Sequence, residues 1–136
     1  MKRLFAALAA ATCLASGAWA KTIDLSTVSA STTANDGDVV TGVLRGNRKI
    51  SIAAGATVTL SDAAINVTGV DSESCKFAGI TCLGDATIIL DGENSVKGFY
   101  KDYPGIYVPL GSTLTIEGSG SLKAGGGGRA AGIGGG

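Results

Sequence analysis

The clearest sign of the fold is the stretch AGITCLGDATIILDGENSVKG at residues 78–98, whose pattern returns in PGIYVPLGSTLTIEGSGSLKA at residues 104–124. The two stretches align without a gap, so every matched pair has the same offset as Ile80 and Ile106. The matched positions are Gly79 with Gly105, Ile80 with Ile106, Thr87 with Thr113, Leu90 with Ile116, Gly92 with Gly118, Ser95 with Ser121, and Lys97 with Lys123. Self-similarity at a constant offset predicts a repeat protein in which one small unit stacks on the next.

Two weaker copies flank this pair. Before it, at the slightly longer offset from Ile50 to Ile80, the matching positions are Ile50, Ile52, Thr57, Val58 and Leu60 against Ile80, Cys82, Thr87, Ile88 and Leu90. After it, Gly132-Ile133 repeats Gly105-Ile106 at a similar offset. Because AGIGGG at residues 131–136 falls where the repeat predicts the first strand of a new unit, we expect a truncated member of a longer architecture, with further rungs as its natural partners.

Short runs of apolar and β-branched residues lie between glycine-rich turns in each unit. They read ISI, TVTL, TIIL and TLTIEG, and their alternation with a period of two residues is typical of strands. The chain contains 22 Gly, and its sequence has no clear amphipathic helix pattern after residue 20. The sequence therefore predicts an all-β fold.

A unit of about 26 residues with three short strands cannot bury its inward side chains alone. Stacking of units at the ~4.8 Å spacing of paired strands would fill a continuous interior. We therefore predict a single-stranded parallel β-helix, a solenoid of about three to four rungs, over residues 48–136, with an N-terminal β cap over residues 21–47. The predicted inward positions are Ile50, Ile80 and Ile106; Val58, Ile88 and Leu114; and Leu60, Leu90 and Ile116, while Thr59, Ile89 and Thr115 are predicted to point outward.

Residues 1–20 have the pattern of a secretory signal peptide. Lys2 and Arg3 precede an apolar run at residues 4–15, and Ala18-Trp19-Ala20 supplies the small-x-small pattern that a signal peptidase cuts. Cleavage after Ala20 would give a mature chain that begins at Lys21. We therefore expect a protein that is secreted, periplasmic or held at the cell surface.

Lipid attachment at Cys13 is the weaker alternative, because Thr12 stands where a small apolar residue or Ser is usual. Export also implies an oxidising compartment, in which Cys75 and Cys82 form a plausible disulfide that closes a short loop. Two buried free thiols are the alternative for this pair.

The charge of the mature chain indicates neither nucleic acid nor a membrane as a partner. Loss of Lys2 and Arg3 leaves nine basic and eleven acidic side chains, a formal charge of about −2 (9 minus 11), with no long run of either sign. After the leader, no apolar stretch approaches the ~18 residues that span a bilayer. We expect no membrane insertion.

The phrases GITCLGDATIILDGENSVKGFYKDYPGI, LTIEGSGSLKA and AAGIGGG occur in this order between residue 79 and the end of the chain. In these phrases the chain resembles bacterial secreted repeat proteins that are labelled carbohydrate-binding domain-containing, of the parallel β-helix type. The likeness covers roughly residue 22 to the end. The resemblance implies a right-handed parallel β-helix outside the cell or at its surface, with contact to glycans. Members of this family usually continue through several more AGIGGG units, which this chain lacks.

The stretch GFYKDYPGIY at residues 98–107 concentrates the aromatic residues of the mature chain. Tyr100 and Tyr107 are candidates for sugar contact, because a tyrosine ring stacks on the apolar face of a pyranose while its hydroxyl stays wet. Lys101 and Asp102 could add hydrogen bonds. In the alignment Phe99 stands opposite Gly125, so it is not expected in the core, whereas Tyr103 matches Phe77, and these two are predicted to form a structural aromatic ladder.

An alternative reading of the aromatic stretch is a loop whose rings cover their own corner. A metal site is also conceivable, because Asp91 and Glu117 have the same offset as Ile80 and Ile106 and would occupy one column, where a calcium ion could neutralise them. Both carboxylates also precede glycines and fit ordinary turns. The chain has no His, so imidazole acid–base chemistry is excluded, and we predict no catalytic residues.

The sequence thus favours an exported, non-enzymatic module that binds a polysaccharide, a cell-surface glycan or another surface polymer, with no required cofactor. An adhesin-like surface spacer without a small ligand is the second hypothesis. A calcium-dependent enzyme similar to polysaccharide lyases is the third.

Overall fold

The computed structural model describes residues 20–69 and 72–135. In this part of the chain the fold is all-β with parallel strand pairing, as the sequence predicts, apart from a single 3-10 turn, η2 (Leu25–Thr27). The predicted signal peptide lies outside the described residues except for Ala20. No helix in the described part has the length and apolar composition needed to cross a membrane.

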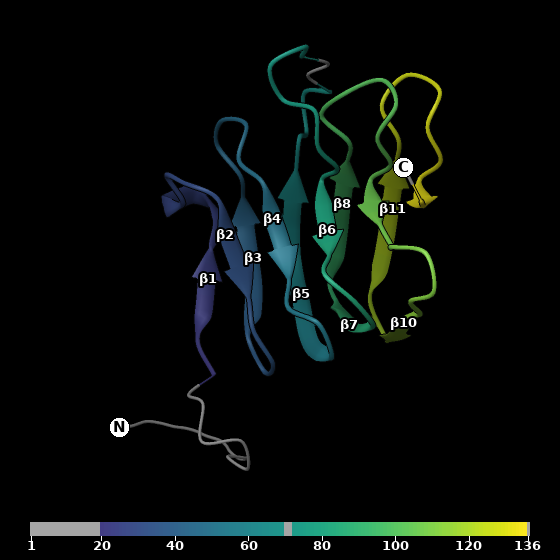
Figure 1. Ribbon diagram of the computed structural model, residues 1–136. Helices are drawn as coiled ribbons and strands as arrows, with labels where there is room; N and C mark the ends of the chain where they lie inside the picture. The colour runs from purple at the N-terminus through teal and green to yellow at the C-terminus, as the bar shows by residue number, and fades with distance from the viewer. Residues whose placement is uncertain (1–19, 70–71, 136) are drawn as a thin grey trace.

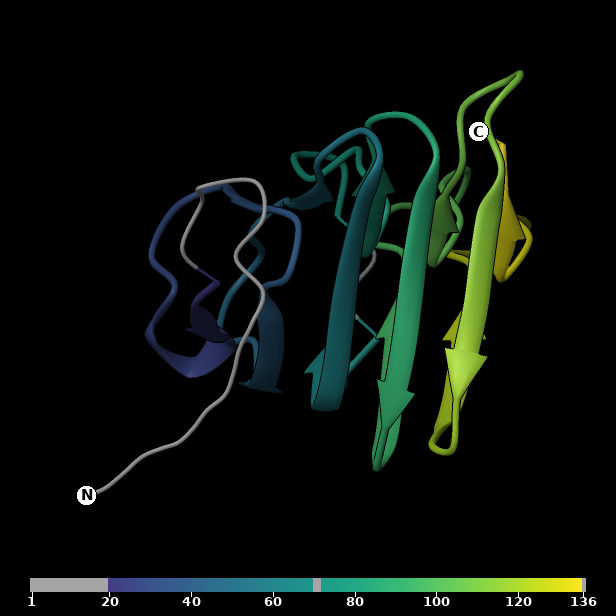
Figure 2. The same ribbon diagram turned by 90° about the horizontal axis from the view of Figure 1, so that it is seen from below.

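The longer sheet has seven strands (Figure 1). They are β1 (Thr22–Asp24), β3 (Val39–Val43), β5 (Ala56–Ile65), β7 (Ala86–Asp91), β8 (Glu93–Lys97), β10 (Leu114–Gly118) and β11 (Ser121–Gly125). The order is β1-β3-β5-β7-β10, and β8 pairs with both β5 and β11. Figure 2 shows β5, β7 and β10 side by side in teal, green and lime. Their order across the sheet is the same as their order in the sequence.

The shorter sheet has five strands in the order β12-β9-β6-β4-β2. They are β2 (Thr32–Ala34), β4 (Ile50–Ile52), β6 (Ile80–Cys82), β9 (Ile106–Tyr107) and β12 (Ile133–Gly134). Consecutive parts of the chain alternate between the two sheets, and the paired strands of the described chain run parallel. Parallel pairing of this kind needs a crossover between partner strands, and here the other sheet provides it.

The register confirms part of the predicted alignment. The predicted match of the first two units is correct, since Ile50 lies beside Ile80 and Leu60 beside Leu90. The match of the next two units is also correct where Ile80 lies beside Ile106. It is wrong in the following strand, because Ala86 lies beside Leu114, whereas the alignment placed it opposite Ser112.

The two-residue difference changes which side chains are neighbours. Between the paired positions Thr81 and Tyr107 and the start of the following strand, the later unit has two more residues than the earlier one. Ile88 therefore lies beside Ile116, not Leu114, and Leu90 beside Gly118. A shift of two residues keeps the parity of a strand, so the predicted inward face of β10 is unchanged although its neighbours are different.

The core is made by inward side chains of both sheets. Alternate residues of β5 are buried from Ala56 to Leu60, and Val58 and Leu60 are fully buried. The same cluster contains Ile50, Ile80 and Ile106 of the shorter sheet. Burial declines toward β10, at the end of the sheet, where Ile116 is 37% exposed. Burial of each inward Ile or Leu side chain contributes about 1.5–3 kcal/mol to the stability of the fold. The shared core therefore stabilises both sheets together.

The segment predicted as a cap, residues 21–47, contains β1, β2 and β3. β1 and β2 are the end strands of the two sheets; β1 pairs in register with β3, Thr22 beside Val39, and β2 pairs with β4, Thr32 beside Ile50. This segment therefore continues the same two sheets at their N-terminal end.

Glycine in the repeated Gly-Ile pair is explained by the close approach of neighbouring backbones. The N–H of Ile80 donates to the carbonyl oxygen of Gly105 at 2.8 Å, and the N–H of Ile106 donates to that of Gly132 at 3.0 Å. A Cβ atom on Gly105 would lie 2.8 Å from the carbonyl oxygens of both Gly125 and Gly132. The position has no room for a larger residue, which is why the motif recurs.

A buried amide connects the strands of the longer sheet. Asn94 of β8 is 4% exposed, and its Oδ1 accepts a hydrogen bond from the N–H of Ala63 at 2.8 Å. Its Nδ2 donates to the carbonyl oxygens of Asp91 at 3.2 Å and Ser121 at 3.3 Å. One side chain thus satisfies backbone groups from three successive layers of the sheet.

Cys75 and Cys82 are free thiols in this structure, so the disulfide between them stays a prediction. Cys82 lies on β6 with its side chain in the core, 1% exposed, in register with Ile52. Cys75 belongs to the preceding loop and packs against the core while partly exposed. Cys82 thus acts as a small apolar core residue.

Candidate functional site

An aromatic hollow of about 650 Å³ lies beside the shorter sheet. Its lining residues are Lys49, Lys76, Phe77, Ala78, Thr81, Tyr100, Asp102, Tyr103 and Tyr107. We call this surface the aromatic hollow. Its volume falls within the usual range for sites that bind small molecules.

The shorter sheet supplies the base of the hollow. Thr81 of β6 lies beside Tyr107 of β9, and both are partly exposed while their neighbours Ile80 and Ile106 are buried. The alternation of a strand therefore directs these two side chains outward. Lys49 immediately precedes β4 and brings a basic group to the same side.

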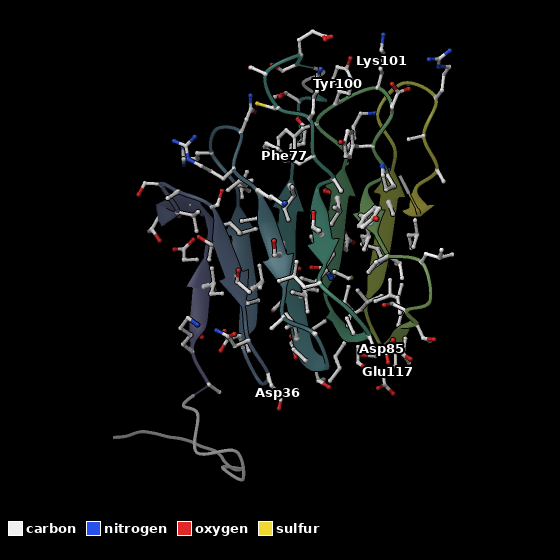
Figure 3. The ribbon with its side chains drawn as sticks, in the orientation of Figure 1. Asp36, Phe77, Asp85, Tyr100, Lys101 and Glu117 are labelled. Carbon is white, nitrogen blue, oxygen red and sulfur yellow. The ribbon has the colours of Figure 1, made fainter. Side chains whose placement is uncertain are left out.

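Two loops form the walls. The loop before β6 contributes Lys76 and Phe77, and the loop between β8 and β9 contributes Tyr100, Asp102 and Tyr103. Phe77 packs on Phe99 with ring centroids 5.1 Å apart, and this contact joins the loops. Figure 3 shows Phe77 and Tyr100 toward the same end of the molecule.

Tyr100 is held in position by several groups. Its hydroxyl donates to the carboxylate of Glu73, with distances of 2.7 Å to Oε1 and 3.0 Å to Oε2. The Nζ atoms of Lys76 and Lys101 lie 5.4 Å and 5.8 Å from its ring centroid, and the Tyr103 ring is 6.2 Å away at an angle of 57°. These contacts fix the ring plane before any ligand arrives, which reduces the entropy that binding costs.

The hollow has an excess of basic groups. Lys49 and Lys76 are exposed, and neither has an ion pair within residues 20–69 and 72–135. Asp102 is the carboxylate among its lining residues, and its Oδ1 lies 3.4 Å from Nη2 of Arg129. The arrangement can stack a ring and attract an acidic group. It does not supply the two carboxylates that glycoside hydrolysis generally uses.

The structure brings together three of the four residues predicted to contact a ligand. Tyr100, Tyr107 and Asp102 line the hollow, whereas Lys101 lies over the Tyr100 ring and is not a lining residue. Tyr103, predicted to be structural, lines the same hollow.

Two predictions for the aromatic residues are wrong. Phe99 is fully buried and is the largest buried side chain of the described residues, although the alignment placed it outside the core. Phe77 packs on Phe99, not in a ladder with Tyr103. The reason is that the loop before β6 folds over Phe99, and its Ser72 N–H donates to the carbonyl oxygen of Phe99 at 2.9 Å.

Sequence reasoning missed Lys49, Lys76 and Thr81. Thr81 could have been found, because the alignment matched it with Tyr107. Lys49 precedes the apolar strand of an earlier unit, and Lys76 lies in the loop before β6, where the matched position in the next unit is Asp102. No periodic signal marks these two lysines.

The carboxylates considered for calcium are not neighbours in the sheet. Glu117 lies beside Ile89, and Asp91 lies beside Ser61, whose hydroxyl donates to its Oδ2 at 3.2 Å. Glu117 is at the opposite end of the molecule from Tyr100 (Figure 3). In the part of the chain that the structure describes, no three acidic, His or Cys side chains are grouped as a metal site would require.

Comparison of the chain with protein-family models, with curated proteins and with solved structures finds no match in any of the three. The candidate site therefore rests on the geometry of the aromatic hollow.

Proposed function

We propose that this chain is an exported, non-catalytic module that binds carbohydrate or another surface polymer in the aromatic hollow. The observation that carries the proposal is the convergence of Tyr100, Tyr103 and Tyr107 on one hollow of about 650 Å³. Aromatic faces bind the apolar face of a sugar ring, and tyrosine hydroxyls add hydrogen bonds at the wet edge.

The ligand favoured by the charges is a glycan with acidic groups, such as a uronic acid. Lys49 and Lys76 provide two ammonium groups, while the charge of Asp102 is partly offset by Arg129. The site is exposed, so the attraction is screened by salt and adds selectivity more than affinity. A neutral glycan would use the same rings but gain nothing from the lysines.

The fold proposed for this module is a right-handed parallel β-helix, of the type seen in the bacterial secreted repeat proteins that the sequence resembles. Three features support it: the chain alternates between two parallel sheets, equivalent residues lie in register, and both sheets contribute to one core. The pattern of the signal peptide supports a location outside the cytoplasm.

A structural surface module is the second candidate. This candidate is supported by the regularity of the longer sheet, in which neighbouring strands pair in parallel from β1 to β10. A stack of this kind can act as a spacer without any ligand.

A panel of acidic and neutral oligosaccharides on an array, followed by titration calorimetry of those that bind, tests the function. Tyr107→Ala should weaken binding by about 5- to 30-fold, as expected for loss of about 1–2 kcal/mol of ring contact. Leu110→Ala is the matched control, because Leu110 is fully exposed and does not line the hollow. Absence of binding to every oligosaccharide and surface polymer tested would favour the spacer.

A further inference from the structure

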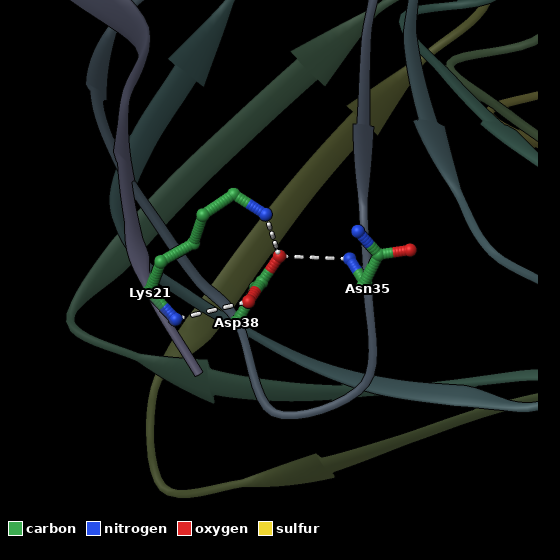
Figure 4. Close-up of polar contacts among 3 residues, drawn as sticks. All are labelled: Lys21, Asn35 and Asp38. Atoms are coloured by element: carbon green, nitrogen blue, oxygen red, sulfur yellow. Dashed lines mark hydrogen bonds and ion pairs between the residues drawn. The ribbon is translucent and has the colours of Figure 1, made fainter. Parts of the chain in front are cut away.

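The buried carboxylate of Asp38 accepts hydrogen bonds from residues near the start of the described chain. The Asp38 side chain is 1% exposed. Its Oδ1 accepts from the backbone nitrogen of Lys21 at 3.0 Å, and its Oδ2 accepts from Lys21 Nζ at 2.8 Å and from the Asn35 N–H at 2.8 Å (Figure 4). One residue, Lys21, thus binds both oxygens.

The Asp38 carboxylate is ionised at neutral pH. Burial is the largest single influence on its pKa and would raise it, but the hydrogen bonds from Lys21 and Asn35, together with the positive charge of Lys21, hold the pKa below its ordinary value. Asp36, the nearest other acid in sequence, is engaged separately, since its Oδ1 accepts from the Thr57 N–H at 2.8 Å. A buried negative charge of this kind is stabilised most by a charged donor.

The nitrogen on Oδ1 is the one that the predicted cleavage would release. The small-x-small pattern Ala18-Trp19-Ala20 ends at the residue before Lys21. The carbonyl oxygen of Lys21 accepts a hydrogen bond from the N–H of Val39, the first residue of β3, at 2.9 Å. This bond holds Lys21 next to Asp38, which immediately precedes β3. The position of Lys21 is therefore set by the folded sheet.

We propose that removal of the leader completes the fold by placing the new α-ammonium group of Lys21 on the buried carboxylate of Asp38. Water hydrolyses the Ala20–Lys21 peptide bond at a signal peptidase, which leaves a carboxylate on Ala20 and an amine on Lys21 that takes up a proton. A neutral N–H donor at 3.0 Å from Oδ1 is thereby replaced by a cation at the same place. The hydrogen bond to the ionised carboxylate then gains a direct attraction between opposite charges at a buried site, so the processed chain is more stable than the precursor.

The inference rests on cleavage after Ala20 and is independent of the ligand in the aromatic hollow. It assigns a role to the first residue of the mature protein: Lys21 binds Asp38 through two nitrogens and fastens β1 at the end of the longer sheet. Cleavage at any other bond would place the new ammonium group on a residue other than Lys21, and therefore away from Asp38 Oδ1.

The first test is N-terminal sequencing of the exported protein, which should begin at Lys21. The second compares the thermal melting of two chains that differ by one residue, one starting at Lys21 and one starting at Ala20. The chain that starts at Lys21 should melt about 3–8 °C higher, because only it has the cation at Oδ1. The same difference should persist in the Lys21→Ala background, in which the α-ammonium remains and Nζ is absent.

Asp38→Asn should abolish the difference between the two starts. If Asp38→Asn does not fold, acylation of the α-amine at neutral pH provides a measurement without that variant. The amine of the chain that starts at Lys21 should react at least about tenfold more slowly than that of the chain that starts at Ala20, and unfolding in urea should remove this protection. Equal melting temperatures, or equal acylation rates, would overturn the proposal, as would an exported protein that starts elsewhere.

Discussion

The rings of Phe77 and Phe99 pack with their centroids 5.1 Å apart and their planes tilted by 54°. The Phe99 N–H also donates to the carbonyl oxygen of Phe77 at 3.1 Å. Phe99 is fully buried, whereas Phe77 is partly exposed and lines the aromatic hollow. The pair therefore connects the core to the candidate site.

Phe99→Ala should lower the free energy of unfolding by about 3–5 kcal/mol, because it removes the largest buried side chain and leaves a cavity. Phe99→Leu retains most of the apolar volume and is the matched control, with a smaller loss. Urea denaturation followed by circular dichroism measures both. A loss below about 1 kcal/mol for Phe99→Ala would mean that the two loops close over the core without this ring.

Gly105→Ala should destabilise the protein by at least about 1–3 kcal/mol, because the new methyl group would lie 2.8 Å from two carbonyl oxygens and force neighbouring backbones apart. Gly135→Ala is the control, since a Cβ atom there has no neighbour within 4 Å and its φ is not in the left-handed region. Thermal melting of both variants checks the prediction. An unchanged melting temperature for Gly105→Ala would contradict the close approach described for the Gly-Ile motif.

Asn94→Ala should cost about 2–3 kcal/mol, since it leaves the buried N–H of Ala63 without its acceptor. Asn94→Asp keeps this acceptor but places an oxygen opposite the carbonyl groups of Asp91 and Ser121. Its folded-state pKa should rise, so its stability should be greatest at acid pH and fall as pH increases through about 4. Chemical denaturation at pH 3.5 and pH 7 measures the two variants. Equal stability of Asn94→Asp at both values would argue against the contact with the carbonyl oxygens.

The sequence predicted the pairing of strands correctly at positions where the close approach of neighbouring backbones permits only glycine. Gly79 and Gly105 precede Ile80 and Ile106, and the close approach at Gly105 excludes any side chain, so the alignment of these dipeptides is unambiguous. The alignment of Thr87 with Thr113 had no such constraint. In the structure Thr87 lies beside Thr115, because a turn on the protein surface accommodates two extra residues without disturbing the core.

The candidate site was predictable only in part, because it combines side chains of the strands with loops whose folding the repeat does not specify. Tyr107 follows from strand alternation, since it comes after the buried Ile106. Lys76 and Phe77 belong to the loop before β6, and although the alignment matched Phe77 with Tyr103, a periodicity along the chain does not say how this loop folds against Tyr100. The burial of Phe99 has the same origin.

The two thiols should react very differently in the native protein. Burial raises the pKa of the Cys82 thiol to about 11, and its side chain is 1% exposed, so at pH 8 it should react with a thiol reagent about 100-fold more slowly than in the unfolded chain. Cys75 is partly exposed and should react first. Mass spectrometry without reductant should show one label on the native protein and two after denaturation.

The same burial predicts a dependence of stability on pH. The folded protein retains the Cys82 proton up to about pH 11, whereas the unfolded chain loses it near pH 8.5, so the free energy of unfolding should fall as pH rises above about 8.5. In Cys82→Ala this part of the fall should be absent, although the smaller side chain lowers stability at every pH. Melting curves between pH 7 and pH 10.5 separate the two effects. If the denatured exported protein takes up no label until a reductant is added, Cys75 and Cys82 form the disulfide that the sequence predicts, and both expectations for the Cys82 thiol are wrong.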